Sequence, residues 1–80
     1  MKKKTKIFKE DDIVKVPYNG HQIFGQINEI NEDKKLAYVY FEIVTDTDTK
    51  LLFGELVVPF SEIIKTCKKD YRKCIQYNYI

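Results

Sequence analysis

The sequence predicts one mainly β (α+β) domain, a small, bent antiparallel barrel of four or five strands with a C-terminal helix. Three observations predict it. Apolar and polar residues alternate in several segments between residues 13 and 58, which is the period of a strand. Turn-forming residues separate these segments, and glycines interrupt two of them, where a sheet can bend. After residue 60 the apolar spacing becomes helical.

The first two strands are expected to form a hairpin. Residues 13–18 alternate in hydrophobicity, and Asn19 and Gly20 follow at once. Both of these residues tolerate a positive φ, which a two-residue type I′ turn requires. The second strand is then expected at residues 21–30, and Gly25 in its middle predicts a bulge or a bend.

Two further strands are expected at residues 36–44 and 51–58, with a polar turn at residues 45–49 between them and a second bend at Gly54. Neither face of these two strands is cleanly polar. A further element must therefore cover part of the sheet.

The C-terminal segment is the candidate for that cover. Ser61 is a suitable N-cap, and a helix is expected over about residues 61–75. Residues 76–80 alternate instead and predict a short additional strand. The apolar residues that fall at helical spacing are Ile63, Ile64, Cys67, Tyr71, Cys74 and Ile75.

Charge is segregated along the chain. Residues 1–9 carry five lysines and no acid, and they are expected to be a mobile basic arm ahead of a single domain at residues 10–80. Residues 10–64 carry four lysines and eleven acids. Residues 65–80 carry five basic residues and one acid, Asp70. The net charge of +2 therefore hides an acidic body between two basic ends.

The compartment is expected to be the cytoplasm. The basic start is not followed by an apolar run of about 7–15 residues, and no segment has the roughly 20 apolar residues that span a bilayer. Cys67 and Cys74 are seven residues apart, about 10.5 Å along a helix, which is too far for a disulfide. Two reduced, packed thiols are expected, with no metal and no cofactor.

Four segments carry a resemblance to a known family. They are residues 12–16, the bent strand around Gly25 and Ile27, residues 38–41, and residues 57–63. Their order resembles the SH3-like small barrels, a group that includes Tudor and KOW-type modules. The likeness covers residues 11–64 and implies a closing strand followed by a short helical turn. The chain has no tryptophan, which peptide-binding members usually carry in their groove, so the resemblance does not imply binding of proline-rich peptides.

No enzyme is expected. His21, the single histidine, stands beside the predicted turn without a serine, cysteine or carboxylate at the spacing of a catalytic triad. Asp46 and Asp48 lie in an acidic, threonine-rich loop, but Leu51 and Val57 stand where a calcium loop needs glycine and glutamate. Glycine-rich phosphate-binding motifs are absent from the sequence.

Two sets of side chains are candidate binding sites. Tyr38 and Tyr40 share one face of a strand, and Tyr18 is expected near them, so these tyrosines are the candidate protein-binding site. The alternative is that the C-terminal helix covers them. The alternative for the cations of the chain is that they only increase solubility. The candidate nucleic-acid-binding residues are Lys2, Lys3, Lys4, Lys6, Lys65, Lys68, Lys69, Arg72 and Lys73.

The leading functional hypothesis is a non-enzymatic module that binds another protein or a second copy of itself. The acidic body opposes phosphate contact through the barrel, and paired tyrosines suit a protein surface. Many Lys, Ile and Asn residues with a single Arg are typical of an AT-rich genome, which suggests an accessory protein of a low-GC bacterium, phage or plasmid that modulates a host protein. The alternative is a nucleic-acid-binding barrel that uses the arm and the helix cations. A third hypothesis is an acidic mimic of nucleic acid that blocks a host enzyme.

Overall fold

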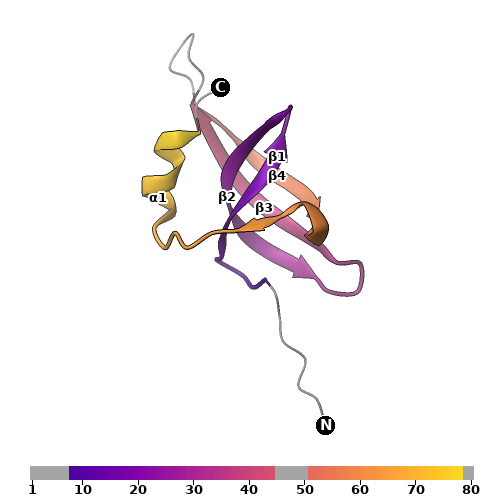
Figure 1. The fold of residues 1–80 in the computed structure, drawn as a ribbon. Coiled ribbons are helices and arrows are strands. Elements are labelled where there is room, and N and C mark those ends of the chain that lie inside the picture. Colours follow the sequence, from indigo (N-terminus) through magenta and orange to yellow (C-terminus); the bar gives the residue numbers. More distant parts are fainter. Residues whose placement is uncertain (1–7, 45–50, 79–80) are drawn as a thin grey trace.

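Five antiparallel strands form one sheet in the computed structural model, which describes residues 8–44 and 51–78 (Figure 1). They are β1 (Ile13–Tyr18), β2 (His21–Asn31), β3 (Leu36–Val44), β4 (Leu51–Pro59) and β5 (Ile64–Lys65). The spatial order is β4-β3-β2-β1-β5, so β4 and β5 are the edges of an open sheet. The expected mainly β class and strand number are confirmed. Closure into a barrel stays a prediction.

The β1–β2 turn has the backbone that its sequence predicts. Asn19 and Gly20 have φ values of 48° and 81°, and Tyr18 pairs directly with His21. Two consecutive residues at positive φ define the type I′ turn and match the twist of the two strands.

The two strand glycines allow close packing. A Cβ atom on Gly25 would overlap Cγ1 of Val39 on the neighbouring strand, so glycine lets β2 and β3 approach each other. The register irregularity predicted at Gly25 lies instead between Ile27 and Glu29. Gly54 pairs with Phe41, whose ring covers the space that a side chain at residue 54 would take.

The main core fills the inner face of the sheet. It includes alternate residues of β1, β2 and β3, Val58 on β4, and Ile63. Phe8 is also buried in it, with its ring centroid 5.2 Å from that of Phe60. The packed domain therefore includes Phe8, two residues before the expected boundary at residue 10. Residues 1–7 lie outside the described residues.

The long C-terminal helix predicted over residues 61–75 is wrong. The chain forms a 3₁₀ turn η1 (Phe60–Glu62), then β5, and a helix only at α1 (Tyr71–Cys74), which continues into the 3₁₀ turn η2 (Ile75–Tyr77). The pairing of β5 with β1 explains why the predicted helix does not form. β5 hydrogen-bonds to β1, and Oγ1 of Thr66 donates to the carbonyl of Ile13 at 2.8 Å. A helix from residue 61 would leave this part of β1 unpaired.

The N-cap of the helix is Asp70, not Ser61. Its Oδ1 accepts a hydrogen bond from the backbone N–H of Arg72 at 3.1 Å. The predicted tail strand is also not formed in its described part, because Gln76 and Tyr77 belong to η2. Residues 79–80 lie outside the described residues.

A second, smaller cluster lies on the outer face of the sheet, where α1 packs beside it (Figure 1). Its buried members are Ile13, Tyr71 and Cys74, and the partly buried members that pack on them are Phe24, Tyr40 and Ile75. The C-terminal segment therefore does cover part of the sheet, over fewer residues than the sequence predicts.

Asn78 fixes the end of this segment between two strands. The β2–β3 ladder begins at the Gly25–Phe41 pair, and Phe24 and Glu42 lie just beyond it. The Asn78 side chain accepts from the N–H of Phe24 and donates to the carbonyls of Phe24 and Glu42, each at 2.9 Å. Its own carbonyl accepts from the N–H of Val44 at 2.8 Å. Asn78 is 2% exposed. Its side chain forms hydrogen bonds with β2 and β3 at the point where the two strands no longer pair with each other.

We expect Asn78→Ala to lower the free energy of unfolding by about 2–4 kcal/mol, because it leaves buried backbone groups of two strands without partners. Urea unfolding followed by circular dichroism measures this loss. Asn28→Ala is the matched control, since the Asn28 amide binds Glu55 at an exposed position, and its effect should stay within about 0.5 kcal/mol. Equal losses in the two variants would contradict the bridging role of Asn78.

Candidate functional site

The three candidate tyrosines do not share a surface. Tyr18 follows Val14 and Val16 on the inner face, and its ring centroid lies 5.1 Å from that of Phe41 in the main core. Tyr38 and Tyr40 lie on the outer face of β3. Successive side chains of a strand alternate between faces, so the structure separates Tyr18 from the other two.

Tyr40 is covered by the C-terminal segment. Its ring centroid lies 6.3 Å from that of Tyr71, whose hydroxyl oxygen accepts from the N–H of Glu42 at 3.0 Å. Desolvation by burial raises the pKa of the Tyr71 hydroxyl above its usual value, and it does the same for Tyr40, where Glu42 adds to the shift. Both hydroxyls therefore stay neutral to a higher pH than a tyrosine in water. Ile64, which was expected to take part in the cover, is exposed.

An apolar surface remains open on the outer face of β4. Phe53 is 68% exposed and Val57 is 58% exposed. Val57 pairs with Tyr38, and Phe53 pairs with Glu42, so these side chains share the outer face. We call Tyr38, Phe53 and Val57 the β4 surface. Glu55 lies between the two apolar residues of β4, and its Oε2 accepts from Nδ2 of Asn28 at 3.0 Å.

The sequence contains the signal for this surface. Phe53 and Val57 are four residues apart in a strand and so must share a face. The 17 residues between the predicted strand at 51–58 and the predicted tail at 76–80 contain the helix that is expected to cover the sheet. That expectation leaves no open surface on β4. The short α1 instead contacts β2, which leaves the outer face of β4 uncovered in the described part of the chain.

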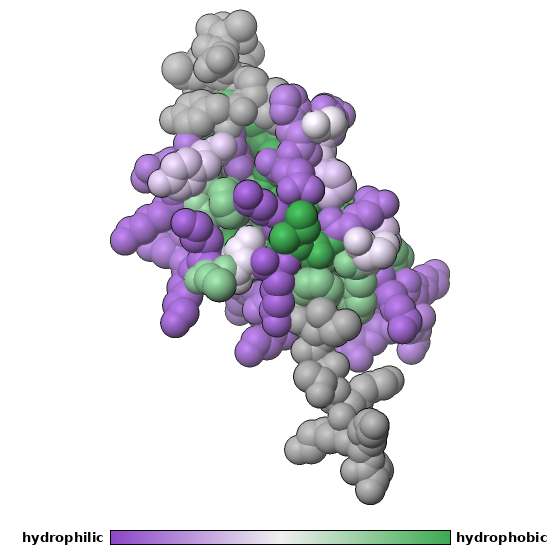
Figure 2. Space-filling view, in the orientation of Figure 1, coloured by the Kyte–Doolittle hydropathy of each residue, from purple (hydrophilic) through white to green (hydrophobic). Residues whose placement is uncertain are grey.

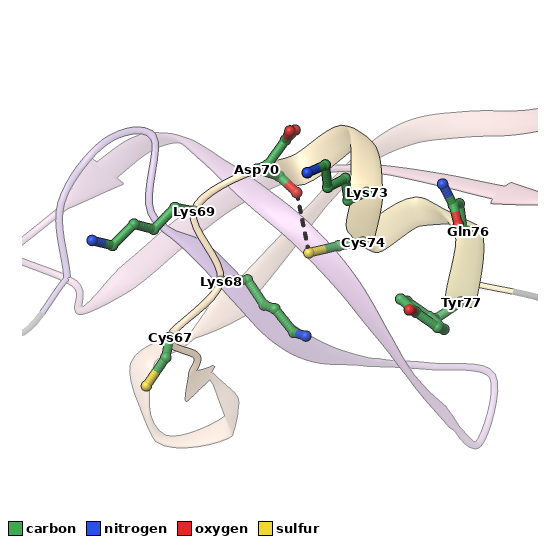
Figure 3. A pocket seen from close by; sticks show the side chains of 8 residues that line it. All are labelled: Cys67, Lys68, Lys69, Asp70, Lys73, Cys74, Gln76 and Tyr77. Atoms are coloured by element: carbon green, nitrogen blue, oxygen red, sulfur yellow. Dashed lines mark hydrogen bonds between the residues drawn. The ribbon is translucent and has the colours of Figure 1, made fainter.

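A second candidate surface is a hollow of about 510 Å³ in the C-terminal segment (Figure 3). Three of the predicted cations line it. Lys68 extends toward the side of the hollow where Tyr77 lies, and Lys69 extends to the opposite side (Figure 3). We call this feature the basic hollow. Its lining residues are Cys67, Lys68, Lys69, Asp70, Lys73, Cys74, Gln76 and Tyr77.

The remaining predicted cations lie elsewhere. Arg72 borders a neighbouring hollow that also contains Glu42 and Lys69. Lys65 borders another that contains Asp11 and Asp12 and is also lined by Lys68 and Lys69. All five cations from Lys65 to Lys73 are exposed. Figure 2 shows that hydrophilic side chains dominate the face on which α1 and β5 lie. The four lysines predicted at the N-terminus, Lys2, Lys3, Lys4 and Lys6, lie outside the described residues.

The two cysteines differ in environment, and both are free thiols. Cys74 is buried, as expected, and its Sγ donates to the carbonyl of Asp70 at 3.3 Å. The expectation that Cys67 is packed is wrong, because Cys67 lies in the irregular stretch between β5 and α1 and is exposed.

Side chains that could hold a metal ion are not gathered in the described residues. No group of three or more His, Cys, Asp or Glu side chains in residues 8–44 and 51–78 could hold a metal ion. His21 is exposed beside the β1–β2 turn, and Asp46 and Asp48 lie outside the described residues. Within the same ranges, each helix is too short to cross a membrane.

The chain matches no protein-family model, no curated protein and no solved structure. The β4 surface and the basic hollow are therefore the observations on which function is argued.

We expect one thiol per folded chain to react at once with a thiol reagent such as Ellman's reagent, because Cys67 is exposed and Cys74 is buried. Absorbance of the released chromophore measures the reaction. Cys67→Ser should abolish the fast phase, and Cys74→Ser should preserve it. A fast phase that survives Cys67→Ser would contradict the burial of Cys74.

Proposed function

We propose that this protein is a non-enzymatic interaction module, built on an SH3-like barrel, that binds another protein through the β4 surface. The exposure of Phe53 and Val57 on an edge strand carries the proposal. Exposed large apolar side chains on an edge strand invite pairing with another chain, and soluble proteins usually cover or charge such an edge.

Three features support the barrel. The sheet runs without a break from β4 to β5, and its inner face encloses one core that reaches from Phe8 to Ile63. Small barrels bury one core on the inner face of a single curled sheet in the same way. The 3₁₀ turn η1 follows β4 as the resemblance to SH3-like barrels implies.

The geometry favours an extended partner segment. In the described part of the chain β4 pairs only with β3, so its other side can hydrogen-bond to an added strand. Alternate side chains of that strand would contact Phe53 and Val57. Glu42 and Glu55 flank these apolar residues, so a partner segment that alternates apolar and basic residues fits best.

The test is affinity capture from a lysate of the organism that encodes the protein, with the immobilised full chain as bait. We expect Phe53→Ser combined with Val57→Thr to reduce the captured partner at least about tenfold, because exposed apolar anchors dominate such interfaces. Ile64→Thr is the matched control, since Ile64 is an exposed apolar residue on the opposite edge strand, and it should retain the partner.

Thermal unfolding of each variant confirms that the fold is intact. If the double variant captures the same partner in the same amount as the unchanged chain, the β4 surface is not the binding site. Size-exclusion chromatography of the purified chain completes the test. A dimer that the double variant dissociates would identify the partner as a second copy of the chain.

The nucleic-acid alternative is favoured by a separate observation, the gathering of Lys68, Lys69 and Lys73 around the basic hollow. No residue of β4 lines that hollow. The two surfaces can therefore act independently of each other.

A further inference from the structure

The basic hollow stands on a fixed backbone. On its N-terminal side the Thr66 hydroxyl binds the carbonyl of Ile13. On its C-terminal side Asn78 binds β2 and β3. Between these anchors, Tyr71 and Cys74 are buried against the sheet. The lysines therefore project from an ordered support and not from a free tail, which lowers the entropy lost when they bind a ligand.

The charge around the hollow is unbalanced. Residues 65–73 contain five cations and a single acid, Asp70. The Asp70 carboxylate caps α1 through the N–H of Arg72. Lys68 and Lys69 also border a neighbouring hollow that contains Asp11 and Asp12, whereas Asp70 is the single acid among the residues that line the basic hollow. Like charges that share one hollow repel each other, so an anionic ligand would bind there favourably.

An aromatic side chain lies at the same hollow. Tyr77 lines it and is 68% exposed. The Tyr77 ring lies 6.3 Å from the ring of Phe24, at an interplanar angle of 57°, and the ammonium nitrogen of Lys15 lies 5.2 Å from the centroid of Phe24. The exposed ring of Tyr77 therefore lies beside a ring that Lys15 contacts, and it shares the basic hollow with Lys68.

We propose that the basic hollow binds single-stranded nucleic acid, with phosphates at Lys68 and Lys73 and a base stacked on Tyr77. Proteins that bind single strands without sequence preference combine a cationic track with aromatic rings on which bases stack. A base within a duplex is not free to stack on a side chain. Recognition of a duplex groove by a helix is also disfavoured, because α1 has only four residues.

The test is fluorescence anisotropy with a labelled single strand of mixed sequence, about 12 nucleotides long, over a salt series. We expect Lys68→Gln combined with Lys73→Gln to weaken binding and to reduce the slope of log K against log salt by about 1.4, since each phosphate contact on a single strand contributes about 0.7. Lys9→Gln combined with Lys34→Gln is the matched control, because both lysines are exposed and lie outside the basic hollow. It should change the slope little.

Tyr77→Ala separates stacking from charge. We expect it to weaken single-strand binding about 5- to 150-fold, as loss of one stacked base does, with the salt slope unchanged. The labelled duplex of the same sequence should bind more weakly than the single strand and should not respond to Tyr77→Ala.

Three results would overturn the proposal. One is the absence of single-strand binding at low salt. Another is equal binding by the unchanged chain and by the double variant at Lys68 and Lys73. If removal of residues 1–7 then abolished binding, the contact would belong to the basic arm. The third is duplex binding as strong as single-strand binding and insensitive to Tyr77. None of these results bears on partner capture through the β4 surface, so the two proposals fail separately.

Discussion

The bridge that Asn78 makes between β2 and β3 determines what the C-terminal segment can do. The two strands stop pairing beyond Gly25 and Phe41, and backbone groups of Phe24 and Glu42 would be left without partners there. Asn78 supplies the missing acceptor for one N–H and the missing donors for two carbonyls, from a position 54 residues away from Phe24 in the chain. Because this end is held, Tyr71 and Cys74 stay against the outer face. The same anchor fixes the lysines and Tyr77 around one hollow, so stability and the candidate site depend on one buried amide.

The strands could be predicted from the sequence because their signals are local. Alternation of apolar residues gave β1 and β3 at their observed bounds, and β2 and β4 within one residue. The C-terminal segment could not be predicted in the same way. Ile63, Cys67, Tyr71 and Cys74 do have helical spacing, but the unpaired side of β1 competes for residues 64 and 65. This pairing becomes visible only once the sheet is assembled. Tertiary contacts thus override the helical spacing of the apolar residues.

The sequence shows which residue types the candidate surfaces contain, but it does not show which of these residues lie together. The excess of cations after residue 64 is visible in the sequence, but a regular helix would have placed all five on one face, because they fall at helical spacing. The irregular stretch between β5 and α1 instead brings Lys68 and Lys69 to the same hollow as Lys73. The tyrosines show the opposite outcome. Tyr18 was expected near Tyr38 on a curved surface, but strand alternation directs it into the main core beside Phe41.

The segregation of charge along the chain determines where a nucleic acid would bind. The body between residues 10 and 64 has eleven acids and four lysines, so it repels phosphates over most of its surface. A single strand would then approach where the cations of the C-terminal segment are exposed, near Tyr77. Two of these acids, Glu42 and Glu55, lie beside Phe53 on the outer face and would attract a basic protein segment. Opposite charge at the two surfaces thus keeps each class of ligand away from the other surface, without any sequence-specific contact.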